Sequence, residues 1–584
     1  MSGGVIPARY VRVVAAAAAA VLFATALASC TNPSIQVSFS KRPVRGTTSV
    51  TVTVINHAVT LTSVSVDSAA AVPVATSTSA AFSFDLDSTA LSDGTHNLWV
   101  ISQTASGTLR GAYPFSVDNS VAALPPGFQL TTALSGLTQP VAVQFASDGR
   151  VFVAEKSGLI KVFASIDSTT PTVFADLRTE VYSGGGHGLL GMTLDPNFPD
   201  TPYIYVLYTL DAPLGGTPPV WNDKCPNPPG AEINGCVVSG RLSRLQADGD
   251  VMTGSEQVLI SDWCQQFSSH AIGSLLFGAD GALYASAGDG ATYASVDYGQ
   301  LGQPATNPCG DPPVPVGGAQ TAPTAEGGAL RAQSLLRPST DPVTLDGSVI
   351  RVDPATGDAL PDNPNAGSSD PNAARIVATG LRNPFRMTLR PGTNELWIAD
   401  VGWNTWEEID RVIDPTAAPV DNFGWPCYEG DAQQPDYQAL NLDICNTLYA
   451  SGAALGPYYE YQHGVSVVPG DRCVTSPSSI TGVAFEPAAG GSYPEQYNGA
   501  LFFADSSRDC IWVMLAGSDG LPDPTTVESF VTGTQGVGSP VDLITGPNGD
   551  LFYADIAGGA IMRVTYSAPD PGSDVAVRGS HPGT

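Results

Sequence analysis

Positive charge is scarce in this sequence. Its 584 residues include 25 Lys and Arg against 55 Asp and Glu, which gives a formal net charge of −30 at pH 7. A broad basic surface that binds nucleic acid or acidic lipid is therefore excluded. The acidic composition favours solubility, and it supplies the carboxylate oxygens that hard cations such as Ca²⁺ prefer as ligands.

Two cysteine motifs and long hydrophobic runs are also missing. No two cysteines have the CxxC spacing of a cysteine zinc site, and no CxxCH motif for haem attachment occurs. The apolar run over residues 13–27 is too short for a transmembrane helix. We therefore expect no membrane span from it.

That apolar run is typical of an export signal. Arg9 and Arg12 precede it, and residues 27–30, Leu-Ala-Ser-Cys, resemble the cleavage box of bacterial lipoproteins. We expect residues 1–30 to be a lipoprotein signal peptide and Cys30 to be lipidated. The mature protein would then be held in the cell envelope by its lipid anchor only, facing the periplasm or the exterior. An ordinary signal peptide cleaved nearby is the alternative.

Eight cysteines remain after Cys30, and an even number in an exported chain favours disulfides. Their connectivity is open among roughly a hundred pairings. We predict the two local pairs Cys225–Cys236 and Cys427–Cys445, because each would close one loop.

Glycine and proline are abundant, at 62 and 48 residues, and strand-like runs recur throughout, which favours an all-β protein with many turns. Residues 33–119 are predicted to be a small separate domain, because residues 49–54 and 81–86 alternate strictly between apolar and polar. Residues 91–100 resemble a turn and late strand of bacterial immunoglobulin-like domains, so we expect an immunoglobulin-like β-sandwich. A linker over residues 120–127 would follow it.

From residue 128 to residue 566 one unit recurs six times: a turn, a β-rich run that ends in an acidic residue, and another strand. Repeated units of this kind predict a six-bladed β-propeller. The long insertion over residues 291–345 would be an ordered cap or a mobile flap, and residues 567–584 a disordered tail.

The stretch from Ser268 to Gly290 has the strongest signal for a site. His270 precedes one predicted strand and Asp289 follows the next, and the turn at residues 279–281 would join these strands as a hairpin. A hairpin would bring the two side chains to the same rim of a sheet. The pair could be a structural turn histidine with its neighbour, or a site.

Five stretches resemble motifs of the glucose/sorbosone dehydrogenase family, which includes soluble sugar dehydrogenases that depend on pyrroloquinoline quinone (PQQ). They occur in the family's order, at residues 188–198, 268–290, 380–386, 406–409 and 422–426. The resemblance covers roughly residues 128–566 and implies a six-bladed propeller, in agreement with the repeat count.

The resemblance also implies roles for individual residues. His270 would be the base that takes the substrate hydroxyl proton, with Asp289 as its partner. Arg382 and Asn383 would contact the quinone oxygens of PQQ.

Calcium is implied by the same resemblance. The backbone carbonyls of Gly402 and Trp403 would hold a cofactor Ca²⁺, and the Glu408 side chain with the Phe423 carbonyl a second, structural Ca²⁺. Glu408 could equally be an ordinary solvated acid.

The sequence departs from the family where PQQ carboxylates are held. Ser507, Ser539 and Val541 stand at positions that are Lys or Arg in the dehydrogenases. Arg508 could replace one contact, and Arg331 or Arg337 from the insertion another.

Three functions follow from these observations. The first is a PQQ- and calcium-dependent dehydrogenase that oxidises an aldose or a related alcohol and passes electrons to an external acceptor. The second is a non-catalytic, calcium-containing propeller that binds carbohydrate or protein at the cell surface. A calcium-dependent hydrolase of the lactonase type is the third.

Overall fold

The computed structural model describes residues 35–39, 44, 47–55, 57–92, 94–117, 124–533 and 537–568. Two compact units divide the chain, Met1–Val121 and Ala122–Thr584. Cys30 and nearly all of the predicted tail lie outside the described residues. Within the described ranges, no helix is long and apolar enough to cross a membrane.

The first unit consists of two antiparallel sheets that enclose one apolar core. One sheet has the order β1–β2–β5 and the other β4–β3–β6–β7. The strands are β1 (Ile35–Phe39), β2 (Thr47–Val54), β3 (Val59–Val66), β4 (Ala75–Ser77), β5 (Ala81–Asp87), β6 (Gly94–Thr104) and β7 (Gly107–Val117). The alternation noted in residues 49–54 places Val50, Val52 and Val54 in the core, where they pack with Val64 and Leu98. The immunoglobulin-like assignment stays a prediction.

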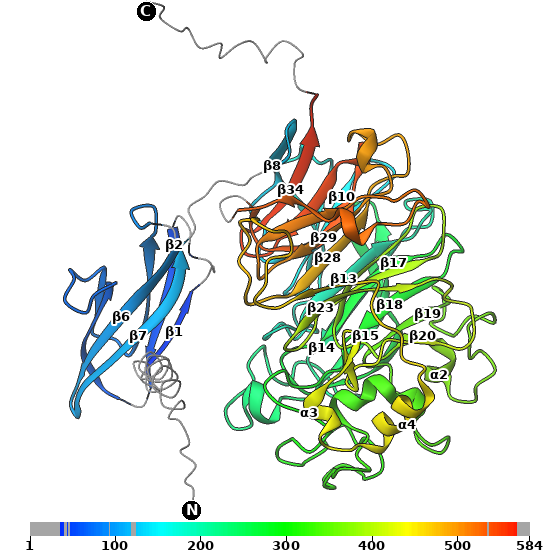
Figure 1. Ribbon diagram of the computed structural model, residues 1–584, viewed down its shortest axis with the longest axis horizontal. Helices are drawn as coiled ribbons and strands as arrows, with labels where there is room; N and C mark the ends of the chain where they lie inside the picture. Colours follow the sequence, from blue (N-terminus) through cyan, green and yellow to red (C-terminus); the bar gives the residue numbers. More distant parts are fainter. Residues whose placement is uncertain are drawn as a thin grey trace, which may run out of the picture. The chain divides into compact units, whose positions relative to one another are not determined.

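The second unit contains six sheets of at least four strands each, built mainly from strands that are consecutive in the chain (Figure 1). The first three sheets hold β9 (Pro140–Phe145), β10 (Val151–Glu155), β11 (Leu159–Phe163) and β12 (Thr172–Asp176); β13 (Leu189–Leu194), β14 (Tyr203–Leu210), β15 (Val238–Asp248) and β16 (Val251–Gln265); and β17 (Ile272–Phe277), β18 (Leu283–Ala287), β19 (Ser348–Val352), β20 (Ile376–Thr379) and β24 (Asp421–Asn422).

The other three sheets complete the unit. They hold β21 (Pro384–Leu389), β22 (Leu396–Asp400), β23 (Trp406–Val412) and β27 (Tyr459–Gln462); β28 (Ile480–Phe485), β29 (Leu501–Asp505), β30 (Cys510–Met514) and β31 (Glu528–Val531); and β32 (Pro540–Thr545), β33 (Leu551–Asp555), β34 (Ala560–Tyr566) and β8 (Phe128–Leu134). The short helices α2 (Pro371–Arg375), α3 (Pro435–Gln438) and α4 (Asp443–Ser451) lie in the connections.

The first strands of the six sheets form a closed ring. Strands β9, β13, β17, β21, β28 and β32 contact one another in that order, and β32 also contacts β9. Strand β8 pairs with β34, so the beginning of the unit completes its last sheet. Radially arranged sheets of this kind make a β-propeller and leave few exposed strand edges. The protein is mostly β, as the sequence predicts.

Four disulfides lie in the connections and strands of this unit. Cys225–Cys236 and Cys427–Cys445 confirm the two predicted pairs, and the others are Cys264–Cys309 and Cys473–Cys510. The Cys264–Cys309 bond ties the insertion over residues 291–345 to the end of β16. The insertion is therefore held to the propeller at Cys309.

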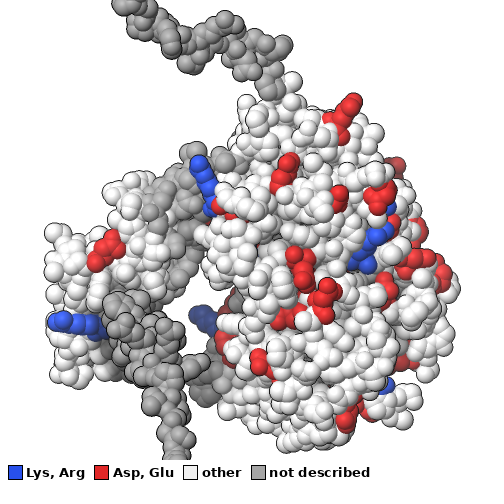
Figure 2. Space-filling model, viewed as in Figure 1, with Lys and Arg blue, Asp and Glu red and all other residues white. Residues whose placement is uncertain are grey.

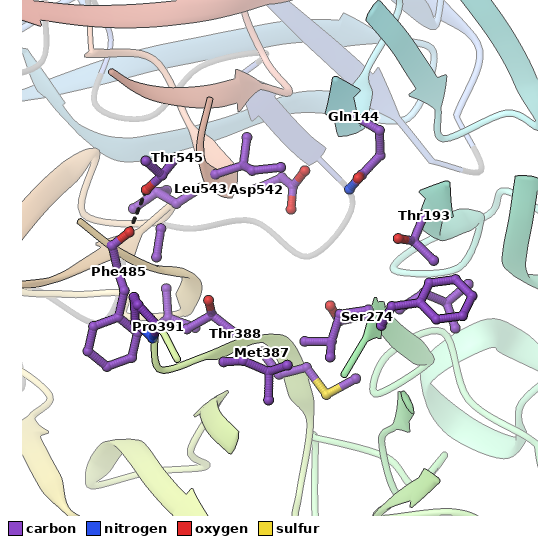
Figure 3. Close-up of a pocket in the computed structure, with 17 residues that line it drawn as sticks. Gln144, Thr193, Ser274, Met387, Thr388, Pro391, Phe485, Asp542, Leu543 and Thr545 are labelled. Carbon is purple, nitrogen blue, oxygen red and sulfur yellow. Dashed lines mark hydrogen bonds between the residues drawn. The ribbon is translucent and has the colours of Figure 1, made fainter. Parts of the chain in front are cut away.

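The inner strands surround a cavity of about 320 Å³ (Figure 3). It is lined near their C-terminal ends by residues such as Gln144, Thr193, Ser274, Thr388 and Thr545. None of the predicted site residues lines this cavity. His270 and Arg382 instead lie just before the opposite, N-terminal ends of β17 and β21.

Candidate functional site

The hairpin of β17 and β18 brings His270 and Asp289 together. His270 lies two residues before β17, and Asp289 lies two residues after β18. The His270 Nδ1 is 2.7 Å from the Asp289 Oδ1. His270 also has a positive φ of 54°, which non-glycine residues rarely adopt, so the surrounding structure holds this backbone in place.

Asp289 is fully buried and accepts three hydrogen bonds. Besides the His270 contact, its Oδ1 accepts from the Ala291 backbone N–H at 2.8 Å, and its Oδ2 accepts from the Trp425 Nε1–H at 2.7 Å. Burial alone would raise the pKa of Asp289, but its interaction with His270, the charge of Arg382 and the hydrogen bond from Ala291 lower it overall. The carboxylate is therefore held in its ionised form.

His270 is held as a neutral ring with one nitrogen free. Burial lowers the pKa of His270 below its ordinary value of 6.5, the charge of Arg382 lowers it further, and Asp289 only partly offsets both. Because Asp289 accepts from Nδ1, the neutral tautomer has its lone pair on Nε2. Nε2 makes no hydrogen bond to any residue that the structure describes. It can accept a proton from a ligand.

Arg382 stands next to this pair. Its carbonyl accepts the Asp289 N–H at 2.9 Å. Its Nη1 donates to the carbonyls of Val401 and Gly402 at 2.8 and 2.6 Å, and its guanidinium carbon lies 5.3 Å from the centre of the Trp425 ring. Its Nε–H is buried and, within the described part of the chain, has no partner. This donor is available to a ligand oxygen.

Asn383, the other residue predicted to contact the quinone, is half-buried. Its backbone N–H donates to the Asp400 Oδ1 at 2.6 Å, and that of Arg382 donates to the Asp400 Oδ2 at 2.8 Å. Asp400 therefore fixes the backbone that carries both residues.

The loop predicted to hold the cofactor calcium is shaped by a residue that sequence reasoning missed. The Glu429 Oε1 accepts from the backbone N–H groups of Trp403, Asn404 and Thr405 at 2.7–3.0 Å. At Gly402 any side chain would collide, because a Cβ there would lie 1.5 Å from the Trp406 carbonyl oxygen.

The carbonyls predicted as calcium ligands differ in their present partners. The Gly402 oxygen already accepts from Arg382, which leaves one lone pair for a metal. The carbonyls of Trp403 and Phe423 accept no hydrogen bond from the described residues. All three can still donate to a cation.

Three acidic side chains meet beside this loop. One carboxylate oxygen from each of Asp400, Glu408 and Asp410 lies within 4.8 Å of the others, and all three residues are buried. Burial raises the pKa of Asp400 to about 7, and it raises the pKa values of Glu408 and Asp410 further above their ordinary values. The Glu408 side chain is therefore no ordinary solvated acid.

The arginines suggested as substitutes for the missing cations are bound elsewhere. The Arg508 guanidinium is fully buried and donates to the Ser478 hydroxyl and to the carbonyls of Val465 and Gln462. Contact of Arg508 with a cofactor stays a prediction that this geometry does not favour.

Arg331 and Arg337 belong to a buried ion-pair network within the insertion. Both pair with Asp311, at 2.7 and 3.2 Å. Ser539 likewise donates to an internal partner, Asp509.

Figure 2 shows that acidic side chains also outnumber basic ones on the visible face of this unit.

The chain has relatives among known proteins. A family model described as glucose/sorbosone dehydrogenase matches residues 137–310 and 329–443. The HIPL1 protein of Arabidopsis thaliana is 23% identical over 401 residues, covering 63% of this chain and 48% of that protein. Quinoprotein glucose dehydrogenase B of Acinetobacter calcoaceticus is 24% identical over 375 residues, covering 64% of this chain and 66% of that protein. The chain thus spans about half to two thirds of the length of these relatives.

Among solved structures, the soluble aldose sugar dehydrogenase of Escherichia coli in its apo-form has a TM-score of 0.50 and 17% identity, covering 75% of this chain and 100% of that chain. This likeness indicates the fold of the second unit. The matched family model identifies the family: the chain belongs to the glucose/sorbosone dehydrogenase family.

Proposed function

We propose that this chain is an exported dehydrogenase, dependent on PQQ and Ca²⁺, that oxidises an aldose or a related alcohol on a six-bladed propeller anchored through Cys30. The observation that carries the proposal is the buried His270–Asp289 pair with its free Nε2. The closed ring of six sheets supports the number of blades. Membership in the family supports the reaction class.

The His270 side chain would act as the general base. Its Nε2 accepts the proton of the substrate hydroxyl, while Nδ1–H keeps its hydrogen bond to Asp289. The resulting imidazolium is stabilised by the Asp289 carboxylate, which is already ionised and correctly oriented. Only 5% of His270 and none of Asp289 is exposed, so little water reaches the pair.

Arg382 would hold the ligand oxygen on the acceptor side of the site. A buried donor without a partner costs free energy, and an oxygen placed against its Nε–H removes that cost. This orphaned donor fits the quinone end of PQQ, and the carbonyls of Gly402 and Trp403 fit a neighbouring Ca²⁺. PQQ, when bound, supplies the two-electron acceptor for the hydride that leaves the substrate carbon.

A second candidate function is binding of carbohydrate or protein without oxidation. It is favoured by Ser507, Ser539 and Val541, which leave the carboxylate end of a PQQ site without the usual cations. Each lost charge-assisted contact weakens binding by about 1.5–3 kcal/mol. PQQ binding therefore separates the two candidates.

The test uses the purified full chain with PQQ and Ca²⁺. PQQ binding and dye reduction are measured across a panel of aldoses for the wild type and for His270→Ala. His463→Ala is the matched control, because His463 also pairs with a buried carboxylate, that of Glu407, at 2.6 Å.

We expect PQQ-dependent dye reduction that His270→Ala lowers by about 10²–10⁴-fold and that His463→Ala leaves unchanged. Absence of both PQQ binding and activity in the wild type would favour the second candidate. Full activity in His270→Ala would rule out His270 as the base.

A further inference from the structure

The three carboxylates of Asp400, Glu408 and Asp410 share one face of the β21–β23 sheet. Asp400 on β22 lies directly opposite Glu408 on β23 in the strand register. Asp410 is two residues beyond Glu408, so its side chain points to the same face. The register alone therefore brings the three groups together.

That face is otherwise apolar and packs against the neighbouring β17–β20 sheet. Leu396, Ile398 and Val412 share the face with the carboxylates, and they form one buried cluster with Tyr284 and Val349. The acidic cluster thus lies at the edge of an apolar contact between two sheets. Burying an unpaired negative charge in such a contact is energetically unfavourable.

The chain itself satisfies these carboxylates only in part. Asp400 accepts two backbone N–H groups, and Glu408 accepts one, from Gly430 at 2.7 Å. Asp410 is fully buried, and both of its oxygens lack a partner in the described part of the chain. Its position within 4.8 Å of the other two carboxylates aims it into the cluster.

No described Lys, Arg or His forms an ion pair with any of the three side chains. Buried charges in proteins are paired or coordinate metals. Carboxylate and carbonyl oxygens in a cluster of several are the ligands that Ca²⁺ prefers.

We propose that Asp400, Glu408 and Asp410 together bind one Ca²⁺ ion between two sheets of the propeller. The proposal goes beyond the calcium site expected from the family, which used Glu408 alone of these three. The bound ion would also have a structural effect on the neighbouring candidate site. Asp400 holds the N–H groups of Arg382 and Asn383, so the ion fixes the backbone beneath the candidate site, whatever reaction occurs there.

The test measures metal binding directly, so it stands apart from the dehydrogenase assay. The full chain is stripped with a chelator, and bound Ca²⁺ is counted by equilibrium dialysis and elemental analysis, with Mg²⁺ as the competing cation. Thermal unfolding is followed with and without Ca²⁺. The variants are Asp410→Asn and, as a second probe, Asp400→Asn.

Glu486→Gln is the matched control. Glu486 is also fully buried, with two oxygens that have no partner among the described residues, but it belongs to no cluster of three acids.

We expect Asp410→Asn and Asp400→Asn each to remove one bound Ca²⁺, or to weaken its binding at least tenfold, and Glu486→Gln to leave both the number and the affinity unchanged. Any calcium held at the Gly402 and Trp403 carbonyls would remain in the Asp410→Asn variant. A folded Asp410→Asn protein that binds as many Ca²⁺ ions as tightly as the wild type would overturn the proposal. So would a wild type that binds no Ca²⁺ or that prefers Mg²⁺.

Discussion

Two buried aspartates in this propeller have opposite surroundings. Asp289 and Asp410 are both fully buried. Asp289 accepts hydrogen bonds from His270, Trp425 and Ala291, whereas Asp410 accepts none from the described residues. The described chain thus supplies hydrogen-bond donors to the Asp289 carboxylate but none to the Asp410 carboxylate.

The difference teaches what each carboxylate can do. Asp289 accepts three hydrogen bonds from the chain, and one of them orients the His270 ring, through which it acts. Asp410 has its whole coordinating capacity left, so it suits a bound ion. Substitutions that remove one charge at a time should affect proton chemistry at the first position and metal binding at the second.

The largest effect is expected from Asp289→Asn. The amide cannot orient and stabilise the His270 imidazolium, so kcat should fall by about 10²–10⁴-fold. Unfolding free energy should also fall, by about 1–3 kcal/mol, because buried hydrogen bonds from His270, Ala291 and Trp425 to the carboxylate are weakened or lost. Steady-state kinetics and urea unfolding measure both effects. An Asp289→Asn enzyme with wild-type kcat would contradict the role of Asp289 in orienting His270.

A smaller effect with a change of sign is expected from Asp410→Asn. In calcium-free buffer the variant should be more stable than the wild type by about 1–3 kcal/mol, because on folding the wild type must either take up a proton at Asp410 or bury an unpaired charge there. In saturating Ca²⁺ it should be less stable, because the ion's binding energy is lost. Denaturant unfolding in both buffers provides the check. The same sign in both buffers would contradict the metal role.

Trp425→Phe should have a still smaller effect, confined to the His270–Asp289 pair. The variant loses the Nε1–H bond to Asp289, a bond to a charged group worth about 1.5–3 kcal/mol. Since Asp289 then becomes more basic, the pKa of His270 should rise and the acid limb of the kcat/KM profile should move to higher pH. An acid limb unchanged from wild type would show that Trp425 only fills space.

The smallest effect is expected on the pH profile of the unaltered protein. Burial and Arg382 lower the pKa of His270 below 6.5, so kcat/KM should stay high down to pH 6.5 and fall only at lower pH, as the ring is protonated. For this group the unfolded state binds the proton first as pH falls, so its contribution to stability decreases below about pH 6.5. A kinetic pKa above 6.5 would contradict this assignment.

The sequence predicted the residues that lie close together in the chain. Spacing and turn chemistry placed His270 and Asp289 at the two ends of one hairpin, and family motifs pointed to Arg382 and Glu408. Trp425 lies in the 422–426 motif but was missed as a partner of Asp289, because 136 residues separate the two. Only the ring of sheets brings the two side chains together.

Strand register explains why the sequence analysis did not predict the cluster of Asp400, Glu408 and Asp410. The alternation of Glu408 and Asp410 puts both on one face of a strand, but their meeting with Asp400 depends on how β22 pairs with β23. In the same way, Arg331 and Arg337 looked free because their partner Asp311 lies in an irregular loop, where no periodic pattern marks it.

The pairing of β8 with β34 has a consequence for synthesis. Its register joins Phe128 to Tyr566, and the Thr131 hydroxyl donates to the Arg563 carbonyl, 432 positions along the chain. A ribosome releases the first of these strands long before it makes the last. The sheet that closes the ring cannot form until β34 has been made, and β8 has an unpaired edge until then. Premature termination anywhere before β34 would therefore leave an open ring with an edge exposed to aggregation.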